Sequence, residues 1–91
     1  MLDKAKKERI IEKFKTHAKD TGSPQVQIAI ITSEIEELAG HLKSHKKDHS
    51  SRRGLLKKVG ERHRLLKYLQ REDNKGYLDL VDKLKLKELK G

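Results

Sequence analysis

Cysteine and tryptophan are absent from this chain of 91 residues, and proline occurs once. Without cysteine, neither a disulfide framework nor a thiolate metal site can form. No apolar run approaches the roughly 18 residues that a membrane span needs, and no apolar signal core follows the polar start of the chain, residues 1–7. We therefore expect a cytoplasmic protein without a membrane partner, and with neither a cofactor nor a bound metal.

Positive charge is what the chain has in excess. Lys and Arg number 23 against 14 Asp and Glu, giving a net charge of +9 with histidine neutral. Only 33% of the residues are hydrophobic, but they are patterned, which distinguishes the chain from a disordered tail. We expect one small domain spanning residues 1–91. Its charge suits phosphate backbones or an anionic membrane surface.

Four helical patterns follow one another, and no segment has a convincing strand pattern. The expected helices span residues 3–15, 24–44, 50–72 and 75–86. Short connections make the second and third helices antiparallel neighbours, and the fourth can close the groove between them. The predicted class is all-α, with a three-helix antiparallel bundle over residues 24–86. The N-terminal helix within residues 1–15 has the weakest apolar stripe, so it should pack least firmly.

Apolar residues at spacings of three and four mark the expected inward faces. They are Ile10, Ile11, Phe14, Ile28, Ile31, Ile35, Leu38, Leu42, Leu55, Leu56, Val59, Leu66, Leu69, Tyr77, Leu80, Val81 and Leu84. Ser23 and Pro24 read as an N-cap followed by proline in the first turn. Gly54, just inside the third helix, is explained by close approach of a partner or of the second helix.

The segment from His41 to Arg53 is a polar corner between the second and third helices. It contains three histidines, three lysines, two arginines, three serines and one carboxylate, and nothing hydrophobic follows Leu42. Cationic donors beside small hydrogen-bonding groups suit a polyanion that is read as well as attracted. This composition favours binding of a folded nucleic acid.

Asp48 is the exception in that basic corner, because a carboxylate repels phosphate. It either caps the third helix or accepts a hydrogen bond from a base amino group. Ser50 and Ser51 could also cap, which would free Asp48 for recognition. The spacing of His41, His45 and His49 could also indicate a zinc site. We set this interpretation aside because structural zinc sites usually have four ligands, most often thiolates.

A second polar cluster lies on the third helix, where Arg64, Tyr68 and Arg71 fall at spacings of four and three. Guanidinium groups fit phosphate oxygens, and a phenol ring packs on sugar or base. The alternative is a half-buried tyrosine beside arginines on an ordinary solvated face. Gly22 supplies a positive φ, admits a phosphate to backbone amides, or simply makes a turn; the sequence does not separate these.

An enzyme is not indicated. No nucleophile stands beside a base, and His, Asp and Ser in one polar loop are composition rather than a catalytic triad. No glycine-rich phosphate loop is present, and a bundle this small has little room for a water-excluding pocket.

Three segments together resemble a known family. Thr21–Ile28 opens the second helix, His41–Leu55 forms the corner, and Arg64–Leu69 lies on the third helix. In that order and spacing they closely resemble the bacterial small-subunit ribosomal protein S15 family, over nearly the whole chain. The resemblance implies a four-helix, monomeric protein that binds the central domain of small-subunit ribosomal RNA early in assembly. It also implies contact with large-subunit RNA across the subunit interface, neighbouring small-subunit proteins, and in some bacteria the protein's own messenger RNA.

The resemblance further implies two RNA sites. A three-way junction would be met by six residues, which are Thr21, Gly22, Gln27, Arg64, Tyr68 and Arg71. A minor-groove site with a G·U pair next to a G·C pair would be met by His41, His45, Asp48 and Ser51. Glu34 stands where the family commonly has arginine, so no contact is carried over to it, and we expect its charge to weaken junction binding slightly. Glu61 and His63 interrupt a stretch that is usually more basic.

The fourth helix also departs from the family pattern, at Gly76 and Lys85, and its usual glycine terminator is missing. Two other classes stay open on the residues alone. A helix-turn-helix DNA-binding protein would need an exposed recognition helix, whereas the long basic helix here is also a core helix. A helical protein-interaction module would bind RNA only weakly and would lose that binding in salt.

Overall fold

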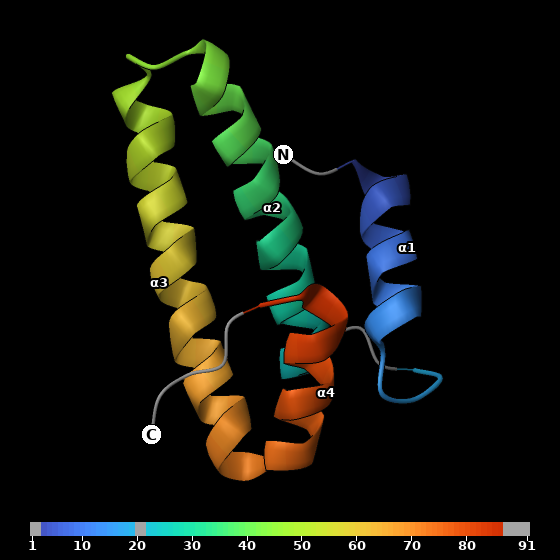
Figure 1. The fold of residues 1–91 in the computed structure, drawn as a ribbon. Helices are drawn as coiled ribbons and strands as arrows, with labels where there is room; N and C mark the ends of the chain where they lie inside the picture. Colours follow the sequence, from blue (N-terminus) through green and yellow to red (C-terminus); the bar gives the residue numbers. More distant parts are fainter. Residues whose placement is uncertain (1–2, 20–21, 87–91) are drawn as a thin grey trace.

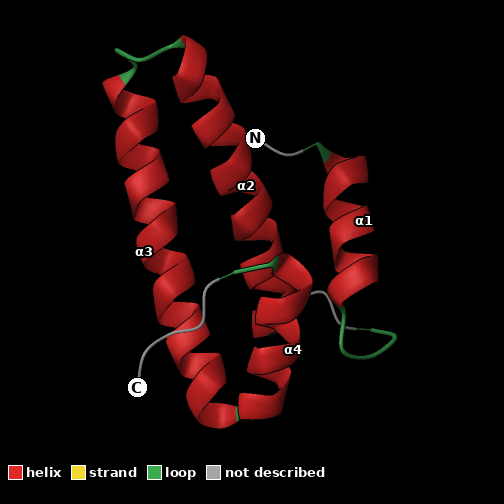
Figure 2. Ribbon diagram, viewed as in Figure 1, coloured by secondary structure: helices red, strands yellow, loops and turns green. Residues whose placement is uncertain are grey.

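The computed structural model describes residues 3–19 and 22–86. In these parts of the chain it contains four α-helices and no strand (Figure 2). The helices are α1 Lys4–Phe14, α2 Pro24–Ser44, α3 His49–Glu72 and α4 Asn74–Leu84. The predicted all-α class is confirmed. None of these helices is both long and apolar enough to cross a membrane.

Helices α2 and α3 lie side by side along most of their length and run in opposite directions (Figure 1). Helix α4 turns back after α3 and packs against both. Helix α1 lies along the other side of α2 and contains no buried residue. This agrees with the prediction of a bundle formed by the last three helices, with a less firmly packed N-terminal helix.

Side-chain caps fix where each helix begins. Asp3, Ser23, Asp48 and Asp73 each accept a hydrogen bond from the backbone N–H three residues later. Such caps satisfy amides that have no partner within the helix. The second helix has the predicted bounds, with Pro24 at its first position. The third begins at His49 rather than residue 50 because Asp48 is the cap, not Ser50 or Ser51.

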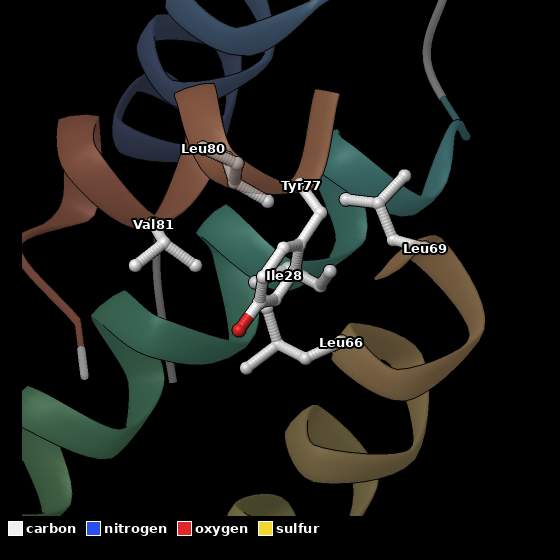
Figure 3. Close-up of a cluster of buried hydrophobic side chains, with 6 residues drawn as sticks. All are labelled: Ile28, Leu66, Leu69, Tyr77, Leu80 and Val81. Atoms are coloured by element: carbon white, nitrogen blue, oxygen red, sulfur yellow. The ribbon is translucent and has the colours of Figure 1, made fainter. Parts of the chain in front are cut away.

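The core is a compact cluster at the end of the bundle where three helices meet. Ile28 of α2, Leu66 and Leu69 of α3, and Tyr77, Leu80 and Val81 of α4 converge there (Figure 3). Phe14, Leu65, Leu84 and Leu86 are partly buried against this cluster. Since α4 supplies half of the fully buried members, the core depends on the turn at Asp73 that brings α4 back.

Two predicted core residues of α3 are not in the core. Leu56 is 66% exposed and Val59 is 39% exposed. Helix α4 has 11 residues against 24 in α3, so at about 1.5 Å per residue it covers less than half of its neighbour. Because α4 follows α3 directly, it covers the second half. The apolar stripe predicted the helix correctly but not where its third neighbour ends.

Three buried residues of α2 were not predicted, namely Val26, Ala29 and Thr32. This part of α2 has α1, α3 and α4 around it, so burial extends beyond a single stripe. Thr32 is buried although polar because its hydroxyl donates to the Ile28 carbonyl at 2.8 Å. A backbone carbonyl of α2 therefore satisfies the hydroxyl of Thr32, and the methyl group of Thr32 packs as an apolar group would.

Two glycines differ in what they allow. A Cβ added at Gly54 would meet nothing within 4 Å, so the predicted close approach of the second helix is wrong. At Gly76, an added Cβ would collide with the carboxylate of Asp73, and that carboxylate accepts from the Gly76 N–H at 3.0 Å. Glycine at residue 76 therefore leaves room for the cap that starts α4. Asp73 also ends α3, where its N–H donates to the Leu69 carbonyl.

Helix α4 ends at Leu84, two residues earlier than predicted, through a left-handed residue. Lys85 has φ 56° and ψ 41°, and the Leu86 N–H donates to the Val81 carbonyl at 2.9 Å. This arrangement usually employs glycine, because a Cβ in the left-handed region is strained. Lysine performs the role of the missing glycine terminator, but with strain.

Replacing Lys85 with glycine is expected to stabilise the protein by about 1 kcal/mol, because it relieves a left-handed residue of its Cβ. Chemical denaturation monitored by helical circular dichroism measures the change. Lys83→Gly is the control, since residue 83 lies inside α4, where glycine costs about 1 kcal/mol. Destabilisation by both substitutions would contradict the proposed strain at Lys85.

Candidate nucleic-acid interface

The carboxylate of Asp48 organises the corner between α2 and α3. Its Oδ1 accepts from the Ser51 N–H at 3.0 Å, and its Oδ2 accepts from the Ser51 hydroxyl at 2.7 Å. His41 Nε2 lies 2.8 Å from the same Oδ2. Asp48 therefore caps α3 and, with the same group, joins its first turn to the last turn of α2. The alternative in which Ser50 or Ser51 caps α3 and leaves the Asp48 carboxylate free is therefore wrong.

These hydrogen bonds hold the pKa of Asp48 well below its usual range. The Ser51 hydroxyl is the largest cause, followed by the Ser51 backbone N–H and the bond to His41, and burial opposes them. Asp48 is thus ionised at neutral pH and can only accept, so His41 Nε2 donates. In the neutral ring, His41 Nδ1 is then an acceptor.

Acid is expected to destabilise the protein partly through Asp48. A depressed folded-state pKa contributes stability that is present above the unfolded-state pKa, near 4, and is lost as pH falls below it. We expect the unfolding midpoint in urea to fall between pH 6 and pH 3. The fall should be shallower in Asp48→Asn, because asparagine caps a helix but does not titrate. An equally steep fall in both proteins would contradict this role of Asp48.

The histidines at the corner are stacked. The rings of His41 and His45 have centroids 4.3 Å apart and an interplanar angle of 7°. His45 Nδ1 lies 3.1 Å from the Ser44 hydroxyl and 3.2 Å from the His41 carbonyl. The stack and the bond to Asp48 together hold the His41 ring in one orientation, while His45 remains exposed.

A hollow of about 590 Å³ opens beside this carboxylate. It is lined by Glu37, Leu38, His41, Asp48 and Ser51. The prediction named the last three of these but not Glu37 or Leu38. Glu37 precedes His41 by one helical turn, a spacing that could have identified it. The hollow therefore presents hydroxyl, imidazole and carboxylate groups around one apolar side chain.

This geometry does not correspond to a catalytic or metal centre. In a triad the imidazole lies between the hydroxyl and the carboxylate, whereas here Ser51 and His41 both bond to Asp48. Within residues 3–19 and 22–86, no three His, Asp or Glu side chains are placed to hold a metal ion. The stacked rings of His41 and His45 lie face to face. The corner is therefore suited to hydrogen bonding.

The second predicted cluster lies on the exposed face of α3. Arg64, Tyr68 and Arg71 are all exposed, and Tyr68 remains 47% accessible. The Arg71 guanidinium lies 5.7 Å from the centre of the Tyr68 ring, within reach of a cation–π contact. Arg71 Nε is 3.5 Å from Glu72, a largely exposed pair. About half of Tyr68 is accessible, so its exposure fits both the binding interpretation and the alternative of a half-buried tyrosine on a solvated face.

The side chain of Gln27 connects Gly22, in the loop before α2, to this face of α3. Gln27 Nε2 donates to the Gly22 carbonyl at 2.7 Å, and a cavity lined by Gln27 also includes Arg64 and Tyr68. The structure therefore brings together Gln27, Arg64 and Tyr68, with Gly22 bonded to Gln27. A Cβ added at Gly22 would meet nothing within 4 Å. Thr21 lies outside the described residues.

Glu34 contacts a lysine of the neighbouring helix. Lys58 Nζ lies 3.3 Å from Glu34 Oε1, and the side chains are 24% and 15% exposed. A half-buried pair of this kind is screened less than a surface pair. The charge of Glu34 is thus balanced within the protein, which weakens the argument that it opposes RNA binding.

The fold and these surfaces define a class: a small, basic, all-helical binding protein with two separate polar surfaces on one helix pair. Comparison with known proteins gives the family. The family model for "Ribosomal protein S15" matches residues 6–87, and the chain belongs to this family. It is therefore a ribosomal protein and not an enzyme.

Curated relatives agree over almost the whole chain. The small ribosomal subunit protein uS15 of Heliobacterium modesticaldum is 62% identical over 86 residues, 94% of this chain and 97% of the relative. The uS15 of Caldanaerobacter subterraneus is 57% identical over 88 residues, covering 97% of this chain and all of the relative. That of Nautilia profundicola is 55% identical over 87 residues, 96% of each chain.

Proposed function

We propose that this chain is a structural constituent of the small ribosomal subunit, acting as one helical RNA-binding domain in the cytoplasm. It binds the central domain of the ribosomal RNA at a three-way junction and at a G·U/G·C minor-groove site. The observation that carries this proposal is the placement of two different polar surfaces on α2 and α3. Family membership supports the ribosomal assignment, and the geometry supports the two sites.

The minor-groove site is formed by His41, His45, Asp48 and Ser51. Minor grooves of RNA helices present 2′-hydroxyls and base edges, which need both donors and acceptors. The exposed part of Asp48 accepts from a guanine amino group, and the Ser51 oxygen and His41 Nδ1 accept from neighbouring donors. Because Asp48 already holds His41 and Ser51, these groups meet the RNA in a fixed arrangement, with little ordering left to do.

The junction site is formed by Thr21, Gly22, Gln27, Arg64, Tyr68 and Arg71. Arg64 and Arg71 bind phosphates, and the exposed ring of Tyr68 packs on a sugar or base. Ser51 and Tyr68 are 17 residues apart on α3, so the two sites are separated by about 25 Å. A rigid spacer of that length holds two RNA helices in one mutual arrangement and selects that arrangement from the ensemble.

Other partners follow from the same assignment. They are neighbouring small-subunit proteins, large-subunit RNA across the subunit interface, and the protein's own messenger RNA. The free protein is a monomer and needs no cofactor.

The test is a titration against a small-subunit three-way junction RNA that carries the G·U/G·C motif, with excess competitor RNA at near-physiological salt. Wild type is expected to bind tightly. Tyr68→Ala should bind this RNA with an affinity lower by roughly tenfold or more, in line with the contribution of base stacking. Asp48→Asn retains a capping side chain. Its affinity should fall by about tenfold or more, because the contact of the carboxylate at the minor-groove site is lost.

Matched controls separate recognition from charge. Asp79→Asn raises the net charge by the same unit as Asp48→Asn, but on the exposed face of α4. Leu56→Ala shortens a large exposed side chain of α3, as Tyr68→Ala does. Both controls should bind like wild type. Equal affinity of all five proteins, or equal binding to duplex DNA, would contradict the proposed sites.

A further inference from the structure

A cavity of about 430 Å³ lies in the groove between α2 and α3, next to the proposed junction site. It is lined by Gln27, Ile31, Glu61, Arg64, Leu65 and Tyr68. Its volume falls within the range of about 300–1,000 Å³ that is typical of small-molecule sites. Three lining residues already belong to the junction site, whereas Ile31, Glu61 and Leu65 have no role there.

The apolar walls of this cavity suit a flat ring. Ile31 and Leu65 are only half-buried by the rest of the protein, so part of their apolar surface faces the cavity. Tyr68 adds an aromatic side chain, and this residue is 47% accessible. Phosphate would leave these surfaces unused and a ribose would cover only part of them, whereas an unstacked nucleobase would cover them together. Aromatic side chains bind extruded bases of single-stranded RNA in this way.

Glu61 gives the cavity its polarity. It is half-buried, yet among residues 3–19 and 22–86 it has no ion pair within 4 Å, unlike Glu34, which binds Lys58. Arg64, one turn away, does not approach it to that distance. A carboxylate on a surface that served only to attract phosphate would oppose binding. Beside an aromatic wall it can accept N–H groups from a base edge instead.

We propose that this cavity binds an unpaired guanine of the RNA at the junction and that Glu61 reads its Watson–Crick edge. The inference rests on the proposed function and adds base specificity to the junction site. Guanine alone among the four bases presents two neighbouring donors, N1–H and N2–H, which match the two oxygens of one carboxylate. Such charge-assisted, bidentate bonds are roughly twice as strong as neutral ones.

The other bases fit the carboxylate less well. Adenine and cytosine each offer one amino group beside an unprotonated ring nitrogen, whose lone pair faces the second carboxylate oxygen. Uracil offers one N–H between two carbonyl oxygens, which repel the carboxylate. Leaving one carboxylate oxygen desolvated and without a donor is unfavourable. Glu61 thereby discriminates against the three bases that Tyr68 alone would accept.

The experiment is a selection from a junction RNA pool in which every unpaired junction position is randomised. Bound and free fractions are sequenced for wild type and for Glu61→Gln, which keeps the size of the side chain but removes its charge. Wild type is expected to enrich guanine at one unpaired position by about tenfold or more. Glu61→Gln should bind the junction and lose this enrichment.

Glu8→Gln is the control, because it makes the same charge change at an exposed position of α1. It should retain the guanine preference. Wild type that binds the junction without preferring guanine, or Glu61→Gln that keeps the preference, would overturn the inference and leave the proposed function standing. Wild type that does not bind the junction above competitor RNA would overturn both.

Discussion

Truncating Tyr77 to alanine is expected to destabilise the protein by about 3–5 kcal/mol, as measured for large aromatic side chains in other cores. The ring is 1% exposed and lies among Ile28, Leu66 and Leu69, so its removal leaves a cavity between three helices (Figure 3). A domain of this size has a stability of roughly 5–14 kcal/mol, at 0.05–0.15 kcal/mol per residue. One substitution would therefore remove a large part of it.

Leu78→Ala provides the comparison, because Leu78 is the next residue of α4 and is 41% exposed. We expect the midpoint of chemical unfolding to fall strongly for Tyr77→Ala and by less than about 1 kcal/mol for Leu78→Ala. Comparable losses in the two variants would mean that α4 contributes through its own helical stability rather than by closing the core.

Raising the monovalent salt concentration from 50 to 200 mM is expected to weaken junction RNA binding by about a thousandfold. That magnitude corresponds to roughly six phosphate contacts, each of which releases counterions from the nucleic acid. A net charge of +9 and the exposed arginines of α3 supply such contacts. Fluorescence titrations at several salt concentrations give the slope of log affinity against log salt.

Two variants divide this effect between attraction and recognition. Arg71→Ala should lower the magnitude of the slope by about 1, because one phosphate contact is lost. Asp48→Asn should weaken binding at every salt concentration and leave the slope unchanged, because it contacts no phosphate. A changed slope in Asp48→Asn together with an unchanged slope in Arg71→Ala would reverse the assigned roles.

Local signals in the sequence were sufficient for most of the fold. The residues from Ser23 onward predicted the second helix to its last residue, because cap, proline and apolar stripe all agree there. The inward face of α4 was also correct at Tyr77, Leu80 and Val81. Those three side chains lie on one face of α4 and pack against α2 and α3 together, so a single periodic stripe describes them.

What the sequence missed depends on distances between helices. The exposure of Leu56 follows from where α4 ends, and the burial of Thr32 follows from three helices meeting around α2. Neither fact is written in the periodicity of one helix. The same holds for the candidate sites. Spacing grouped Arg64 with Tyr68, but only the packing of α2 on α3 places Glu61 in a cavity with Gln27.

The shared carboxylate of Asp48 constrains how this position can vary. It starts α3 and also orients His41 and Ser51. Serine or asparagine at residue 48 preserves the first of these tasks and not the second. Selection for a folded protein alone would accept such replacements, whereas selection for an ordered corner would not. Residue 48 is therefore under two independent selective constraints, one for a folded protein and one for an ordered corner.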